Sequence, residues 1–260
     1  MVGYDDAYHF SKLFKKRFGI TPTQARRLEN ISILRRKIMR YFFESKLERN
    51  DGGYIIDIPF NVWEVCKQRD VIQADIVLDN RIIQCELLPK EKGNYYIQLE
   101  DEDASGIELG TPHQILLHVT GSIIRMDQNS PYDFDHPVRK IDSRQVIKQP
   151  EDGLCGQACV AMLAGRTIAE VITIMDCREW QATMGRVISA LNYYGIDHAD
   201  VINYNEGREV VLPKCCIMME KMGRYCHYLI HYDGLYYDSN LGVLQEYDMS
   251  KLLGFLEIKC

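Results

Sequence analysis

The chain has 260 residues, a length that suits two or three small domains. Its 46% hydrophobic and 26% charged residues are the proportions of an ordinary globular protein. No apolar run approaches the ~18 to 20 residues that cross a bilayer and no signal-peptide pattern opens the chain, so we expect a cytoplasmic protein without membrane contact. The net charge of −6 is uneven, since the first 40 residues carry +7 and the remainder −13, and only the N-terminal segment is suited to contact nucleic acid.

Residues 1–40, which hold ten Lys or Arg and three Asp or Glu, are predicted to form a helical basic arm. A first amphipathic helix ends at Gly19, because glycine readily takes the backbone conformation that closes a helix. A second helix begins at Thr21-Pro22, with proline in its first turn, and the helical spacing continues to about Arg40.

This arm resembles the end of an AraC/XylS-type DNA-binding domain, namely its second helix-turn-helix and the helix after it. The positions that match the pattern are Gly3, Asp6, Phe10, Ser11, Phe14, Lys15, Gly19, Thr21, Pro22 and Arg26. The resemblance implies DNA binding, and the candidate phosphate contacts are Lys12, Lys15, Lys16 and Arg17. The first helix-turn-helix and its supporting helices are missing, so we expect weak, sequence-tolerant binding. Either the gene starts upstream of Met1 or the segment is a remnant that packs on the next domain as a basic amphipathic helix.

Residues 41–122 are predicted to form a small closed β-barrel. The hydrophobic pattern becomes alternating at Tyr41, and turn signals at 50–53, 79–80 and 92–94 separate four or five short strands that end near residue 119. The Ile-Pro-Phe-x-Val entry and the paired hairpins resemble the small barrel of YdeI-type proteins. That resemblance implies no particular chemistry, so we interpret the segment as a structural or ligand-sensing module.

Residues 123–145 are polar, contain two prolines and are predicted to be a linker to a third domain, residues 146–260. This last domain is predicted to contain a helix after Cys155 and a second helix at about 183–194. Strands are expected at 215–220, 225–232 and 235–239.

Cys155 is the candidate nucleophile. The Asp152-Gly153 turn precedes a run of small and apolar residues, which places Cys155 at the N-terminus of a buried helix. Unpaired N–H groups and the helix dipole at that position favour thiolate over thiol. Gln149, six residues upstream, is a candidate to join the Cys155 backbone N–H in an oxyanion hole.

The segment RYCHYLIHYDGLYYDSN supplies a candidate base. Asp233-Gly234 is a two-residue hairpin signal, and pairing about it places His227 opposite Asn240 and on the same face as Asp238. Asp238 is therefore expected to hold the imidazole ring in its working tautomer.

The order Gln-x5-Cys-Gly, helix, Gly-containing helix, His-Tyr and then Asp resembles the bacteriocin-processing cysteine peptidases that remove double-glycine leaders, and more broadly the papain-like fold. The resemblance covers about residues 146–260 and implies an α+β fold and cleavage of a peptide or isopeptide bond in a peptide or protein substrate, without a cofactor. That family usually has proline where this chain has Ser239, so the leader-peptide specificity is left open. The implied roles are nucleophile for Cys155, base for His227, orienting group for Asp238 and oxyanion donor for Gln149.

Two other interpretations stay open: a DNA-binding regulator with C-terminal sensing domains, and a catalytically inactive papain-like interaction module. His231, beside the hairpin turn, and Cys159, one helical turn after Cys155, are expected to be structural. The nine cysteines include no C-x-x-C pair and lie mostly in apolar stretches, so we expect neither a metal site nor a structural disulfide.

Overall fold

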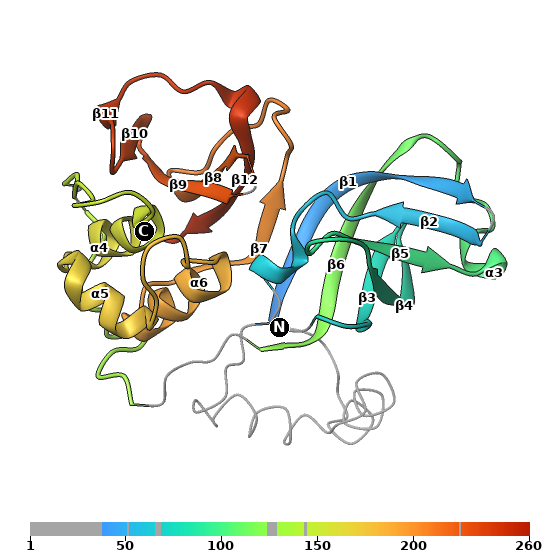
Figure 1. Ribbon diagram of the computed structural model, residues 1–260, viewed down its shortest axis with the longest axis horizontal. Coiled ribbons are helices and arrows are strands. Elements are labelled where there is room, and N and C mark those ends of the chain that lie inside the picture. The colour runs from blue at the N-terminus through green and yellow to red at the C-terminus, as the bar shows by residue number, and fades with distance from the viewer. Residues whose placement is uncertain (1–37, 51, 66–68, 124–128, 143–144, 224) are drawn as a thin grey trace, which may run out of the picture. The chain divides into compact units, whose positions relative to one another are not determined.

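The computed structural model describes residues 38–50, 52–65, 69–123, 129–142, 145–223 and 225–260 (Figure 1). Every described residue belongs to one compact unit, residues 37–260. The helices predicted for residues 1–37 and the candidate DNA contacts Lys12, Lys15, Lys16 and Arg17 lie outside the described residues.

The predicted small β-barrel is confirmed, but it has six strands and not the four or five that were predicted (Figure 1). Neighbouring strands follow the order β1-β2-β5-β4-β3-β6, and β6 pairs antiparallel with β1 to close the barrel. Alternate residues of β3 are buried, as the alternating pattern predicts. The strands are β1 (Ile38–Asn50), β2 (Gly53–Asp57), β3 (Ile72–Leu78), β4 (Arg81–Pro89), β5 (Tyr95–Leu99) and β6 (Pro112–Ile123), with a short η2 (Val62–Glu64) and α3 (Asp101–Ala104) between strands.

The predicted turn between β3 and β4 is confirmed. Asp79 and Asn80 have φ angles of 47° and 62°, and Leu78 pairs with Arg81 on the far side of the loop. Two positive φ angles give a twist that matches the twist of the flanking strands, which explains the choice of Asp and Asn there.

The prediction that helical spacing continues to Arg40 is wrong at its end. Ile38 to Arg40 begin strand β1, and Arg40 pairs with His118 on one side and with Val201 on the other. Strand partners that are distant in the sequence therefore override the local helical pattern.

The C-terminal part of the chain contains a second six-stranded sheet, in the order β7-β12-β8-β9-β10-β11. The predicted strands after residue 214 are confirmed as β8, β9 and β10, whereas β7, β11 and β12 were not predicted. These strands are β7 (His198–Tyr204), β8 (Cys215–Met222), β9 (Tyr225–Tyr232), β10 (Leu235–Asp238), β11 (Gly242–Leu244) and β12 (Leu252–Ile258), with η3 (Met249–Lys251) before the last strand.

Three helices pack together beside this sheet (Figure 1). They are α4 (Cys155–Ala164), α5 (Ile168–Met175) and α6 (Met184–Tyr193). The helices predicted after Cys155 and at about 183–194 are confirmed as α4 and α6. Every residue of α4 is buried, and this helix contacts β9 as well as both other helices. The described residues as a whole are mostly β.

The barrel and the second sheet share a strand pairing. Residues Arg40 to Phe42 of β1 run parallel to Val201 to Asn203 of β7. Phe60, which follows β2, stacks on Tyr204 of β7 with ring centroids 4.0 Å apart. Barrel residues are consequently held against the C-terminal part of the chain, which matters for the site described below.

The linker was expected over residues 123–145, but Ile123 is still part of strand β6, whereas residues 129–142 contain no helix or strand. They nevertheless pack against the end of α6. The Val138 N–H donates to the Tyr194 carbonyl at 2.9 Å, and the ring of Tyr132 contacts those of Tyr193 and Tyr194.

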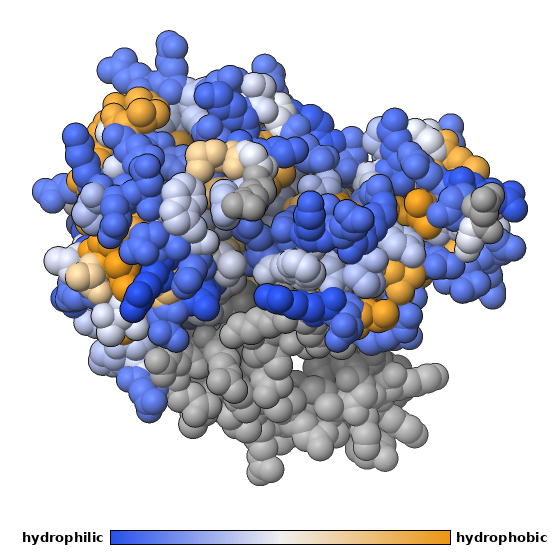
Figure 2. Space-filling model, in the orientation of Figure 1, coloured by the Kyte–Doolittle hydropathy of each residue, from blue (hydrophilic) through white to orange (hydrophobic). Residues whose placement is uncertain are grey.

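Within the described residues no single helix is both long and apolar enough to cross a membrane; α4 and α5 meet that criterion only as a pair, with a bend of 110° between them. On the face drawn in Figure 2 the described surface is mostly hydrophilic, and apolar side chains form small, separate groups.

Candidate active site

Cys155 is the first residue of α4, as predicted. It is 8% exposed and lines a pocket of about 280 Å³. Gly153, in the turn before it, has a φ angle of +91°, a backbone conformation that residues other than glycine rarely adopt. Because the first N–H groups of a helix have no partner within it, the thiol lies beside donors that stabilise a negative charge.

Gly156 lets the start of α4 approach its neighbours closely. A β-carbon at this position would lie 2.6 Å from the β-carbon of Ala182 and 3.4 Å from the ring of Tyr228. Gln157 is fully buried and donates from its amide to the Arg178 carbonyl at 3.0 Å. These contacts fix the segment before α6 against α4.

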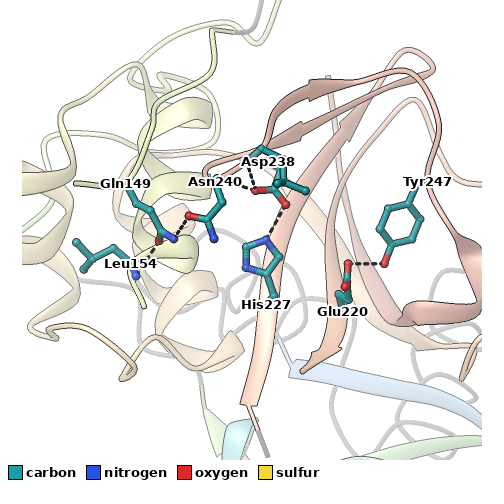
Figure 3. Close-up of polar contacts among 8 residues, drawn as sticks. Gln149, Leu154, Glu220, His227, Asp238, Asn240 and Tyr247 are labelled. Carbon is teal, nitrogen blue, oxygen red and sulfur yellow. Dashed lines mark hydrogen bonds and ion pairs between the residues drawn. The ribbon is translucent and has the colours of Figure 1, made fainter. Parts of the chain in front are cut away.

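The predicted hairpin between β9 and β10 is confirmed, with its register. Asp233 and Gly234 have φ angles of 51° and 84°, and Leu235 pairs with Tyr232 across them. On this hairpin His227 Nε2 donates to Asp238 Oδ2 at 2.7 Å (Figure 3).

Asp238 is 3% exposed and all its hydrogen bonds favour the ionised carboxylate. Oδ1 accepts from the backbone N–H groups of Asn240 and Leu241 at 2.7 and 3.0 Å, while Oδ2 accepts from His227. Burial alone would raise the pKa of Asp238, but these hydrogen bonds hold it below its usual value. Asp238 is thus a fixed negative charge behind the imidazole.

The imidazole of His227 lies between the Asp238 carboxylate and the pocket that Cys155 lines. Burial would lower its pKa, but the hydrogen bond with Asp238 and the nearby Cys155 thiol group raise the pKa of His227 to about 10. Because Nε2 bonds to Asp238, Nδ1 is the nitrogen left for Cys155. The arrangement favours an imidazolium beside the Cys155 sulfur at neutral pH.

Gln149 lies at the same pocket but with more partners than the sequence predicted. Its Oε1 accepts from the Leu154 N–H at 3.0 Å, and its Nε2 donates to Asn240 Oδ1 (Figure 3). The Gln149 backbone N–H also donates to the Ser239 carbonyl at 3.2 Å. Gln149 therefore joins the turn before Cys155 to the turn after Asp238, and one N–H of its amide group is used in doing so.

His231 and Cys159, the two residues expected to be structural, are both buried. His231 Nδ1 donates to the Pro213 carbonyl at 2.9 Å, its Nε2 accepts from the Gly234 N–H at 3.3 Å, and burial lowers its pKa. Cys159 is 0% exposed, and burial raises the pKa of its thiol well above the usual value.

Several residues of the pocket carry no signal in the sequence. Glu64, from the barrel segment, is the most distant of them along the chain, and its carboxylate accepts from the Tyr228 hydroxyl at 3.4 Å. Burial raises the pKa of Glu64. The other lining residues that were not predicted to belong to the site are Trp180, Ala182, Thr183, Met222, Tyr225, Cys226, Tyr228 and Asn240.

A second pocket of about 320 Å³ lies on the Asp238 side of the imidazole and shares Met222, His227 and Asn240 with the first. At its edge Tyr247 donates from its hydroxyl to Glu220 Oε2 at 3.1 Å (Figure 3). His227 thus borders both pockets. No cluster of three or more His, Cys, Asp or Glu side chains able to hold a metal ion occurs in the part of the chain that the structure describes.

Comparison with known proteins identifies two segments. Residues 1–27 match the bacterial regulatory helix-turn-helix proteins of the AraC family. Residues 43–116 match a domain of unknown function, DUF1905, and include most of the barrel. None of the curated proteins compared with the chain matches it. Both predicted N-terminal resemblances are therefore supported, and neither match extends into residues 117–260, where the candidate active site residues other than Glu64 lie.

Proposed function

We propose that residues 146–260 form a papain-like cysteine peptidase domain that cleaves a peptide or isopeptide bond. The observation that supports this best is the position of His227, which hydrogen-bonds to buried Asp238 and lines the same pocket as Cys155, the first residue of a helix. A nucleophile, a base and a group that orients the base, brought together at one site, are the components of nucleophilic catalysis by cysteine.

The proposed reaction begins with attack of the Cys155 thiolate on the substrate carbonyl carbon. The C–N bond then breaks, the His227 imidazolium gives its proton to the leaving amine, and a thioester remains on Cys155. In the second half, neutral His227 takes a proton from water, the resulting hydroxide attacks the thioester, and the thiolate leaves. The imidazolium–thiolate pair is regenerated with the release of a carboxylic acid.

Gln149 and the backbone N–H of Cys155 are proposed to stabilise the oxyanion in both halves. The Gln149 amide group lines the pocket, and its contact with Asn240 uses one of its two N–H bonds. A donor of this type acts on the tetrahedral intermediate and not on the resting thiolate.

Digestion of a mixed peptide library by the full-length chain, followed by mass spectrometry, tests the proposal. We expect cleavage products with the wild type and none with Cys155→Ala or His227→Ala. Products that persist in both variants would overturn it. Alkylation at Cys155 without any cleavage would indicate the inactive interaction module instead.

A second candidate function is DNA binding by the N-terminal segment. The match of residues 1–27 to AraC-family regulators and the positive charge of residues 1–40 favour it. We propose that Lys12, Lys15, Lys16 and Arg17 contact DNA phosphates in a weak and salt-dependent interaction.

A further inference from the structure

The barrel segment contributes a carboxylate to the pocket of the candidate nucleophile. Asn61 caps the short helix η2 by accepting from the Trp63 N–H at 3.0 Å, and Glu64 ends this helix. The backbone carbonyl of Glu64 lies 3.6 Å from a β-carbon built on Gly185, in the first turn of α6. Glu64 is therefore positioned by the barrel on one side and by α6 on the other.

Tyr228 ties Glu64 to the catalytic residues. It follows His227 in β9, is 1% exposed, and packs its ring near Gly156 in the nucleophile's helix. Its hydroxyl donates to Glu64 Oε2 at 3.4 Å. The carboxylate is thus held by a buried neighbour of both the base and the nucleophile.

Two aromatic rings form another wall of the same pocket. Trp180 and Tyr225 have ring centroids 5.2 Å apart, and they are 50% and 38% exposed. Trp180 has φ +61°, which is unusual for a bulky residue, and its N–H donates to the Gly153 carbonyl at 2.8 Å. A strained residue held in place at a site rim indicates that the position of its side chain matters.

A carboxylate and aromatic rings that line one pocket are a combination that binds cations. Aromatic rings attract ammonium and guanidinium groups through their negative faces, and a carboxylate adds a charged hydrogen bond. Asp152 adds a second acidic side chain, and no Lys or Arg lines this pocket among the residues that the structure describes.

We propose that this pocket selects substrates with a positively charged group, and that Glu64 is its specificity-determining residue. The inference rests on the proposed peptidase function and names its substrate class: peptides with a lysine or arginine side chain, or a free amino terminus, close to the scissile bond. A bound cation would offset the cost of keeping the Glu64 carboxylate charged in a partly buried place.

The test uses peptidyl acyloxymethyl ketones, which are electrophiles that modify a catalytic cysteine. Lysine is compared with norleucine, and arginine with citrulline, at each of the three positions nearest the reactive group. A third pair compares a free with an acetylated amino terminus. The rate of modification of Cys155 is measured for the full-length wild type, for Glu64→Gln, and for Glu102→Gln as a control at an exposed barrel carboxylate.

At one position or more we expect the cationic probe to react about tenfold faster than its neutral partner in the wild type and in Glu102→Gln. In Glu64→Gln, which keeps an acceptor for Tyr228, the ratio should fall to about 1. The rate with iodoacetamide, a small neutral reagent, should stay within about twofold of the wild type.

The outcomes separate the two proposals. If iodoacetamide fails to modify Cys155 faster than the other thiols, the proposed function fails. If iodoacetamide modifies Cys155 but no cationic probe is preferred, or the preference survives in Glu64→Gln, the specificity proposal is overturned while the peptidase proposal stands.

Discussion

His227 and Asp238 face each other across the β9–β10 hairpin, with 2.7 Å between Nε2 and Oδ2. The two-residue turn at Asp233-Gly234 sets the register that brings them together. Asp238 lies at the end of β10, where the chain turns back and supplies two backbone N–H groups to its second oxygen. These two backbone bonds hold the Asp238 carboxylate in addition to its bond with the imidazole.

The protonation state of His227 follows from this geometry. With its pKa raised to about 10, His227 should remain an imidazolium at pH 8, whereas His231, whose pKa is lowered by burial, should be neutral. NMR of protein with labelled histidine, assigned with His227→Ala, shows both rings in one spectrum. Asp238→Asn should lower the pKa of His227, because it removes the partner charge.

The same shift has a consequence for stability. Because the pKa of His227 in the folded chain exceeds its ordinary value of 6.5, its contribution to the free energy of unfolding is complete below pH 6.5. That contribution is lost as the pH rises toward 10. A His227 titration at or below pH 6.5 would contradict this account of the hydrogen bonds.

Replacing Gln149 should affect peptide turnover but not the reactivity of the Cys155 thiol. Gln149→Ala should leave the alkylation rate of Cys155 almost unchanged but reduce peptide turnover by roughly 10² to 10³, because an oxyanion donor acts only on the tetrahedral intermediate. His227→Ala should reduce both rates. Stopped-flow alkylation and a turnover assay on the best library peptide measure the two quantities.

Asn240→Ala is the control for this test, since it removes the contact that Gln149 makes across the pocket but keeps the amide. Equal losses of turnover in Asn240→Ala and Gln149→Ala would mean that Gln149 acts by holding the turn and not as a donor.

The close contact between Gly153 and Trp180 should affect the free energy of unfolding of a Gly153 variant. A β-carbon at Gly153 would lie 2.7 Å from the Trp180 ring, and both Gly153 and Gly106 have positive φ angles, of +91° and +82°. Nothing lies within 4 Å of a β-carbon at Gly106, so Gly106→Ala should cost only the ~1 to 2 kcal/mol of the backbone conformation.

Gly153→Ala should cost about 1 to 2 kcal/mol more than Gly106→Ala in urea unfolding, because the ring must move as well. Equal costs would show that Trp180 moves aside freely and does not form a rigid wall of the pocket.

The basic arm should bind DNA through charge alone. Fluorescence anisotropy with two unrelated duplexes should give similar weak affinities that fall steeply between about 50 and 200 mM salt. Replacing Lys12, Lys15, Lys16 and Arg17 with alanine in the full-length chain should abolish most of that binding. Tight binding to one sequence, with little salt dependence, would show that the segment reads bases.

Local signals in the sequence predicted much of the fold. The Asp79-Asn80 and Asp233-Gly234 turns, the alternation of β3 and the apolar run after Cys155 each act over a few residues, so the barrel strands, α4 and the β9–β10 register were foreseeable. The candidate residues Cys155, His227 and Gln149 line one pocket, and Asp238 binds His227 from behind it.

What the sequence did not predict depends on contacts between distant residues. β12 inserts between β7 and β8, and Ile38 to Arg40 become a strand because β6 and β7 pair with them. Glu64 enters the pocket only because the barrel packs against α6 and Tyr228, and no pattern around residue 64 indicates such a contact. The register of the β9–β10 hairpin predicted that Asn240 lies opposite His227. Its hydrogen bond with Gln149 was not predictable, because it depends on the geometry of the turn after Asp238.

The described cysteines differ in the burial of their thiol groups. Burial raises the pKa of Cys85, Cys216 and Cys226 to about 12, which makes them poor nucleophiles at neutral pH. Cys260 is exposed, so access to solvent alone would favour its labelling over that of Cys155, which is 8% exposed.

Limiting iodoacetamide at pH 7, followed by peptide mass spectrometry of the full-length chain, is the most direct measurement. We predict that Cys155 is labelled before all other thiols, and that His227→Ala removes this advantage because the thiolate loses its imidazolium partner. Labelling of Cys260 first, with Cys155 inert in the wild type, would contradict the assignment of Cys155 as the nucleophile.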